Sequence, residues 1–111
     1  MIETKLLGIF QNALSVPVYM EEPENAPRGG YVVLRKTGSA CENRIREATI
    51  AVLSYGDSLE KAAELNETVV LTALELGPAD GVFSCKLNSD YEYTDLQTKQ
   101  YRYQAVLEVY Y

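Results

Sequence analysis

The sequence predicts an α+β fold, a mostly antiparallel β-sheet with two helices packed on one face, in the order α-β-β-β-α-β-β. Two segments carry apolar residues at three- and four-residue spacing, which is typical of helices that bury one side. Four longer runs are rich in β-branched and aromatic residues, which is typical of strands. The length of 111 residues and the 47% hydrophobic content indicate a single α+β domain spanning residues 1–111.

The N-terminal part predicts a helix, a short extended piece and a loop. Residues 2–15 form the expected helix, and Pro17 ends it because the residue before a proline leaves helical geometry. Residues 17–21 are expected to be extended. Residues 20–30 hold prolines, glycines and acids without periodicity, which predicts a mobile acidic loop. The helix stripe consists of Ile2, Leu6, Ile9, Phe10 and Ala13.

The middle of the chain predicts two strands and a second helix. Residues 31–40 and 42–55 are the strands, joined by the linker "GSACEN", and the second is apolar on both faces, as a central strand would be. The helix over 56–77 is capped by Asp57 or Ser58, and Gly77 with Pro78 stops it. Asp57 and Glu60 have the spacing of a capping box. The expected helix stripe consists of Leu59, Ala62, Ala63, Asn66, Val70 and Ala73.

The last two strands, residues 82–93 and 101–111, are predicted to flank a protruding hairpin loop at about 94–100. Alternation predicts that Tyr91 and Tyr93 share the apolar face of their strand with Phe83, Cys85 and Leu87. The same pattern predicts Tyr101 and Tyr103 on the apolar face of the last strand. On this interpretation the rings pin the hairpin, with about 0.2–1 kcal/mol per cross-strand pair.

The charge balance and the residue types argue against several functions. The net charge is −6 without any dense run of Lys or Arg, which disfavours broad nucleic-acid binding. The chain has no histidine, and its two cysteines, Cys41 and Cys85, have no partner at zinc-ligand spacing. We therefore expect no catalytic residues, no cofactor, no metal site and no enzyme. No signal peptide or membrane span is expected, and both thiols are expected to stay reduced.

Three stretches carry a resemblance to known proteins, "VPVYMEEPENAPRGGYVVLRKTGS", "ATIAVLSYGDSLEKAAELNE" and "LNSDYEYTDLQTKQYRYQAVLEVYY". Over these stretches the chain resembles a family of small proteins encoded in the tail-morphogenesis regions of prophages in Gram-positive bacteria. The most specific part of the resemblance is the hairpin "TD-x-x-TK-x-YRYQ", here Thr94, Asp95, Thr98, Lys99, Tyr101, Arg102, Tyr103 and Gln104. The family is similar to tail-terminator and tail-completion proteins of siphophages, which are non-enzymatic α+β subunits that close into a ring, usually a hexamer.

The resemblance implies a homo-oligomeric ring in the virion tail, assembled in the bacterial host cytoplasm with tail-tube or head–tail connector proteins. It leaves open a tail-terminator, a head–tail joining or a minor tail role. Two further hypotheses are a small-ligand or regulatory binding module, which requires an apolar pocket, and a nucleic-acid-binding domain built on the tyrosine hairpin. The candidate assembly or partner contacts are Glu21, Glu22, Glu24, Arg28, Asp95, Lys99, Arg102 and Tyr110.

Overall fold

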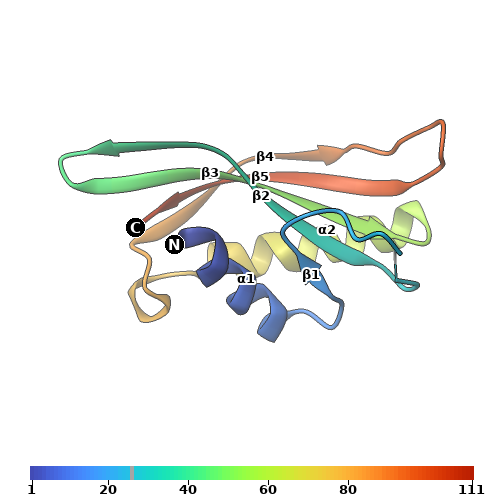
Figure 1. Ribbon diagram of the computed structural model, residues 1–111, viewed down its shortest axis with the longest axis horizontal. Coiled ribbons are helices and arrows are strands. Elements are labelled where there is room, and N and C mark those ends of the chain that lie inside the picture. The colour runs from blue at the N-terminus through green and yellow to red at the C-terminus, as the bar shows by residue number, and fades with distance from the viewer. Residues whose placement is uncertain (26) are drawn as a thin grey trace.

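The structure is a computed structural model that describes residues 1–25 and 27–111. Ala26, inside the predicted acidic loop, lies outside the described residues. The elements are α1 Ile2–Ala13, β1 Val18–Tyr19, β2 Tyr31–Glu42, β3 Ile45–Gly56, α2 Leu59–Leu74, the 3-10 helix η1 Pro78–Asp80, β4 Ser84–Glu92 and β5 Tyr101–Tyr110 (Figure 1). The predicted α+β class and the order α-β-β-β-α-β-β are confirmed.

The five strands form one sheet in the order β1-β2-β3-β5-β4. β1 runs parallel to β2, and the other neighbouring pairs are antiparallel. Both helices lie on the same side of the sheet, α1 against β1 and β2, and α2 against β3, β4 and β5 (Figure 1). We call this side the covered face. The other side, over which no helix of residues 1–25 and 27–111 lies, is the open face.

The first helix buries most of the apolar stripe that its sequence predicts. Ile2, Leu6 and Phe10 are buried against the covered face, Ile9 is only half-buried, and Ala13 is exposed. Leu14 is already extended, so α1 ends two residues earlier than predicted. The early stop lets the buried Leu14 side chain join the same core.

The second helix is capped by Ser58, whose Oγ accepts a hydrogen bond from the backbone N–H of Lys61 at 3.2 Å. Because the cap is Ser58, the capping box predicted from Asp57 and Glu60 is out of register. The predicted stripe was also wrong at three positions, because Leu59 is 38% exposed and Ala63 and Val70 are only half-buried. The residues that α2 buries are Ala62, Asn66, Val69 and Ala73.

The hairpin between β2 and β3 is tighter than predicted. Asn43 and Arg44 have φ angles of 52° and 65°, which is the geometry of a two-residue primed turn. The linker "GSACEN" is therefore mostly strand, and Cys41 lies within β2, where it is exposed. β2 carries an irregularity between Lys36 and Gly38, which makes Thr37 an extra residue.

A second bulge, between Leu87 and Ser89 in β4, overturns the predicted positions of Tyr91 and Tyr93. Asn88 is the extra residue, so every side chain after it changes faces. Asp90 then lies opposite buried Ala105 on the covered face, and Tyr91 lies opposite Gln104 on the open face. Tyr91 and Tyr93 are 42% and 48% exposed, so these two rings do not pack with Leu87 as the alternation predicted.

The bulge places Asp90 where it satisfies a polar group of the core. Its Oδ2 accepts a hydrogen bond from Nδ2 of buried Asn66 at 2.8 Å, which joins α2 to β4.

The beginning of α2 lies very close to the end of β3. A Cβ on Gly56 would lie 2.5 Å from the backbone nitrogen of Ala62, so only glycine allows this approach.

The molecule is elongated, with extents of 44 × 25 × 24 Å. The β2–β3 hairpin projects at one end, and the loop between β4 and β5 projects at the other (Figure 1). In the part of the chain that the structure describes, no helix is both long enough and apolar enough to cross a bilayer.

Candidate functional site

The acidic segment after β1 is tied to the open face by two tyrosines. Tyr31 of β2 and Tyr55 of β3 are cross-strand partners, and their rings stack with centroids 4.3 Å apart at an angle of 7°. Both hydroxyls donate hydrogen bonds to the carboxylate of Glu22, that of Tyr31 at 3.4 Å. The ring of Tyr19 meets Tyr31 edge-on at 6.1 Å. Glu22 therefore anchors the segment that the sequence predicted to be mobile.

Burial and the nearby Glu22 carboxylate change the acidity of both tyrosines. Burial of the hydroxyl raises the pKa of Tyr31 to about 12, and the negative charge of Glu22 adds to the effect. Burial likewise raises the pKa of Tyr55 to about 12, with the hydrogen bond to Glu22 as the second cause. Both phenols therefore remain neutral donors to Glu22 throughout the physiological range of pH.

Arg102 of β5 links this anchor to the hairpin that ends β4. Its Nη1 donates to the Tyr55 hydroxyl at 3.4 Å, and its Nε donates to the Tyr93 carbonyl at 2.6 Å. The guanidinium carbon lies 4.7 Å from the centroid of the Tyr93 ring. Arg102 thus holds the acidic segment and the β4–β5 hairpin at the same end of the sheet.

A cleft of about 350 Å³ separates the acidic segment from the β4–β5 hairpin, and we call these two parts the protrusions. Gln100 spans it, because its Nε2 donates to the Tyr31 hydroxyl at 3.4 Å. Gly30 forms part of its wall with φ +99°, and a Cβ there would lie 2.6 Å from the Tyr55 carbonyl oxygen. The cleft is lined by Pro27, Arg28, Gly30, Tyr31, Tyr55, Gly56, Asp57, Thr98, Lys99, Gln100 and Tyr101.

The hairpin loop is braced by hydrogen bonds around Asp95. Its Oδ1 accepts from the backbone N–H of Gln97 at 3.0 Å, and the backbones of Asp95 and Gln100 bond to each other. The hydrogen bond from the Thr98 side chain lowers the pKa of Asp95, followed by that from Gln97. Lys99 instead adopts a left-handed conformation with φ 54°, and it forms no ion pair with Asp95 in the described structure. Leu96, at the tip, is 84% exposed.

The other end of the open face is organised around Tyr110. Lys86 of β4 lies over its ring, with Nζ 5.6 Å from the centroid. Partial burial raises the pKa of Tyr110, and the charge of Glu47 on β3 adds to this. Nearby Ile45, close to the β2–β3 turn, is 46% exposed. This end therefore presents one aromatic and one aliphatic side chain among charges.

The predicted contact residues fall into two groups. Glu22, Arg28, Lys99 and Arg102 line or brace the cleft at one end, and exposed Glu21, Glu24 and half-buried Asp95 lie in the two segments that flank it. Tyr110 stands apart at the far end of β5, eight residues from Arg102, or about 26 Å along a strand. The sequence predicted Tyr110 on the polar face of the last strand, and the structure places it on the open face of the sheet.

Sequence reasoning missed Tyr31, Tyr55 and Gln100, which join the two protrusions. Asn43 signals a two-residue turn with Arg44, because asparagine tolerates a positive φ angle. That turn alone would set Tyr31 opposite Gly56, and it is the extra residue at Thr37 that brings Tyr31 opposite Tyr55. Cys85 has no comparable role, since burial raises the pKa of its thiol to about 11. Among the residues described, no group of three or more acids and cysteines is placed to hold a metal ion.

Comparison with known proteins returns no match, either to a protein-family model or to a curated protein. The function must therefore be argued from the geometry of this chain.

Proposed function

We propose that this chain is a non-enzymatic structural subunit of a phage tail that assembles with copies of itself into a ring. The observation that carries the proposal is the contrast between the two faces of the sheet. The covered face is buried under both helices, while Ile45, Tyr91 and Tyr93 stay exposed on the open face. Exposed aromatic side chains on a rigid sheet are typical of protein–protein interfaces.

The two projecting ends suit contacts with two different neighbours. At one end the anchored acidic segment and the β4–β5 loop flank a cleft, and Leu96 points a bare apolar side chain outward. At the other end the β2–β3 hairpin extends beyond the helices (Figure 1). A ring subunit at the head-proximal end of a tail needs one surface toward the tail tube and another toward the head–tail connector. The role proposed for this chain is therefore that of a tail terminator or a head–tail joining protein. Assembly in the host cytoplasm and a final place in the virion tail follow from this role.

Light scattering after size exclusion tests the proposal. The protein alone at high concentration, or mixed with tail-tube or connector protein, is expected to run well above its 12.4 kDa monomer mass. A mass of one monomer in every mixture, with no binding to either tail component, would contradict it.

The cleft supports a second candidate function, a small-ligand or regulatory binding module. Arg28 and Lys99 bring two cations, against the one carboxylate of Asp57, to a space of about 350 Å³. Such a cleft would accept a small anion with an aromatic or apolar part. Calorimetric titration with aromatic carboxylates should then show saturable binding, and the double variant Arg28→Ala, Lys99→Ala should abolish it.

A third candidate, single-stranded nucleic-acid binding, gains one observation from the β4 bulge. Tyr91 and Tyr93 are exposed on the open face, and Arg102 lies beside Tyr93, as base stacking requires. The net charge of −6 opposes it. Titration with single-stranded DNA at low salt decides the matter, since absence of binding there excludes this function.

A further inference from the structure

Two edges of the sheet have no strand partner in residues 1–25 and 27–111. β4 forms one edge along its whole length. On the opposite edge, β1 pairs only with Val32 and Val33, so β2 is unpaired on its outer side over residues 34–42. Unpaired strand edges expose N–H and C=O groups that another strand can bind. The two edges are of similar length, and they bound the sheet at its first and last strands.

We propose that the outer edge of β4 pairs antiparallel with the outer edge of β2 in a second copy of this chain. The sheet then continues from one subunit into the next, with Lys86 opposite Glu42 and Glu92 opposite Lys36. This inference rests on the proposed self-assembly and specifies the surface that carries it.

Charge selects the antiparallel direction. In this direction, Lys86 near the start of β4 meets Glu42 at the end of β2, and acidic Glu92 meets Lys36. A parallel arrangement would instead bring Lys86 toward Lys36 and Glu92 toward Glu42. Directly opposed unlike charges stabilise a strand pair and like charges destabilise it, so the parallel arrangement is disfavoured.

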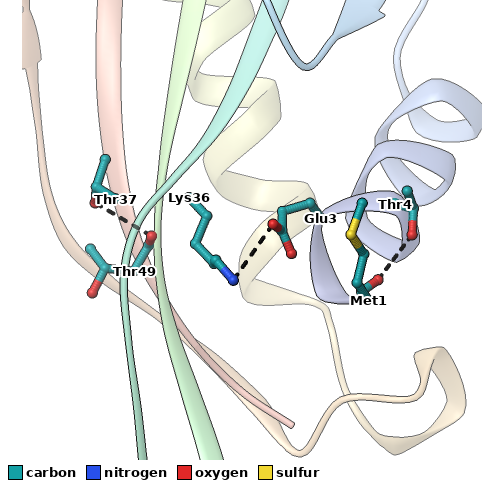
Figure 2. Close-up of polar contacts among 6 residues, drawn as sticks. All are labelled: Met1, Glu3, Thr4, Lys36, Thr37 and Thr49. Atoms are coloured by element: carbon teal, nitrogen blue, oxygen red, sulfur yellow. Dashed lines mark hydrogen bonds and ion pairs between the residues drawn. The ribbon is translucent and has the colours of Figure 1, made fainter.

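The two bulges agree with this register. Between Lys86 and Glu92, β4 carries one extra residue, Asn88, and between Lys36 and Glu42, β2 carries one extra residue, Thr37. Figure 2 shows Thr37 at its bulge, where its hydroxyl donates to the Thr49 carbonyl at 3.4 Å. Because each strand has one extra residue, the shift in register that one bulge causes is cancelled by the other. Opposed side chains then share a face along the whole pairing, which a slip of one residue would destroy.

The backbone groups at one end of the pairing are also oriented correctly. The N–H of Val32 donates to the Pro17 carbonyl at 2.9 Å, so it points outward from β2. Backbone groups alternate in direction along a strand, so those of Lys36, four residues later, point outward too. The N–H of Tyr93 points into the sheet, toward the Arg102 carbonyl at 2.8 Å, so that of Glu92 points outward. Lys36 and Glu92 can therefore exchange two backbone hydrogen bonds.

Side chains next to these residues are complementary as well. The register sets exposed Tyr91 opposite Gly38, which has no side chain to obstruct the ring. It also sets Tyr93 opposite Arg35 on the open face, where β2 pairs Arg35 with Ala51. Lys36 already binds Glu3 of α1 at 3.6 Å (Figure 2), and an ammonium group has further donors for Glu92.

Pairing of two different edges is a head-to-tail contact. Such contacts generate closed rings when the rotation between subunits closes, and open filaments when it does not. The assembly predicted here is therefore cyclic or helical, and a two-fold dimer in which β4 pairs with β4 is excluded by the proposal.

Disulfide trapping tests the register. In a Cys41→Ser background, the double variant Glu42→Cys, Lys86→Cys places the two thiols directly opposite each other across the interface. Directly opposed Cβ atoms lie about 4.5–5.5 Å apart and diagonal ones about 7–8 Å, whereas a disulfide needs about 3.5–4.5 Å. Mild oxidation should therefore give a ladder of cross-linked multimers. The matched control Glu42→Cys, Ser84→Cys uses the same face two residues out of register and should cross-link at least about tenfold less.

A charge-swap cycle provides the second measurement. Lys86→Glu alone and Glu42→Lys alone each create a like-charge pair, so each should weaken self-association by about 3- to 30-fold. The double variant restores an unlike pair and should recover most of the wild-type association. A double variant that associates no better than the single variants would overturn the pairing.

The outcomes separate this inference from the proposed function. Two results would overturn the strand pairing and leave the tail role intact. One is assembly above monomer mass in which the Glu42→Cys, Lys86→Cys variant forms no cross-link, and the other is a stronger cross-link in the control variant. A mass of 12.4 kDa at every concentration and with both tail components overturns both the pairing and the tail role.

Discussion

The covered and open faces of the sheet differ in what their residues accomplish. On the covered face, Phe10, Leu34 and Ile50 are at most 1% exposed and belong to one continuous core with α1 and α2. On the open face, a smaller buried cluster of Tyr31, Val33, Leu53 and Tyr55 occupies one end, and the rest of the face is only partly covered. The comparison indicates that one face of the sheet provides stability and leaves the other available for contacts.

The largest effect should come from the covered face. Phe10→Ala removes a fully buried ring and should lower the free energy of unfolding by about 3–5 kcal/mol. Phe83→Ala removes the same ring where it is 64% exposed, and should change that free energy by less than about 0.5 kcal/mol. Urea unfolding followed by circular dichroism measures both, and similar losses would erase the contrast.

Two glycines of the helix layer should give smaller changes in stability, of opposite sign. Gly56→Ala forces a Cβ into the backbone of α2 and should cost about 1–3 kcal/mol in unfolding free energy. Gly8→Ala in α1 meets no atom within 4 Å and should instead stabilise by about 0.5–1 kcal/mol, because alanine favours helix. The same unfolding experiment measures both variants, and a destabilising Gly8→Ala would contradict the position of α1.

The tyrosine anchor predicts a loss of stability in alkali. The folded pKa values of Tyr31 and Tyr55, about 12, lie above the ordinary value of 10.0. A raised folded pKa stabilises fully below pH 10, and this contribution is lost as pH rises from about 10 to about 12. Glu22→Gln removes a charge and should return both values part of the way, since burial is the larger cause. Tyrosinate absorbance during a pH titration shows the late-ionising fraction, which should move to lower pH in Glu22→Gln. A late-ionising fraction that this substitution leaves unchanged would contradict the anchor.

Tyr91 and the tyrosine anchor show which parts of the structure could be predicted from the sequence. The strand and helix order followed from periodicity, but the face of Tyr91 did not, because one extra residue at Asn88 reverses every later side chain. A bulge arises from contacts with the neighbouring strand, and these cannot be read from alternation alone. The meeting of Glu22 with Tyr55 depends on 33 residues of separation and on the β2–β3 register, which the misplaced linker "GSACEN" obscured.

Among the candidate contact residues of the loop, Asp95 and Lys99 should matter more for assembly than for stability. Their combined replacement by alanine should weaken self-association or binding to tail components while the unfolding midpoint changes little. The reason is that both are held only within an exposed loop. Loss of stability without loss of binding would return the loop to a purely structural role.

A smaller change in stability is expected from Tyr91→Ala. The ring is 42% exposed, and its hydroxyl accepts a hydrogen bond from Nε2 of Gln104 at 2.7 Å, so the free energy of unfolding should fall by only about 0.5–1 kcal/mol. Self-association, measured by analytical ultracentrifugation, should nevertheless weaken, because the ring is predicted to lie against Gly38 of a neighbouring copy. Unchanged association would remove Tyr91 from the interface.

Hydrogen exchange as a function of protein concentration tests the contrast between stability and assembly most directly. The outer-edge amides of residues 34–42 and 84–92 should exchange fast in dilute protein and become protected as concentration rises, while the helix-backed core of β3 keeps the same protection throughout. Edge amides that exchange as fast at concentrations at which larger species form as they do in dilute protein would contradict the account.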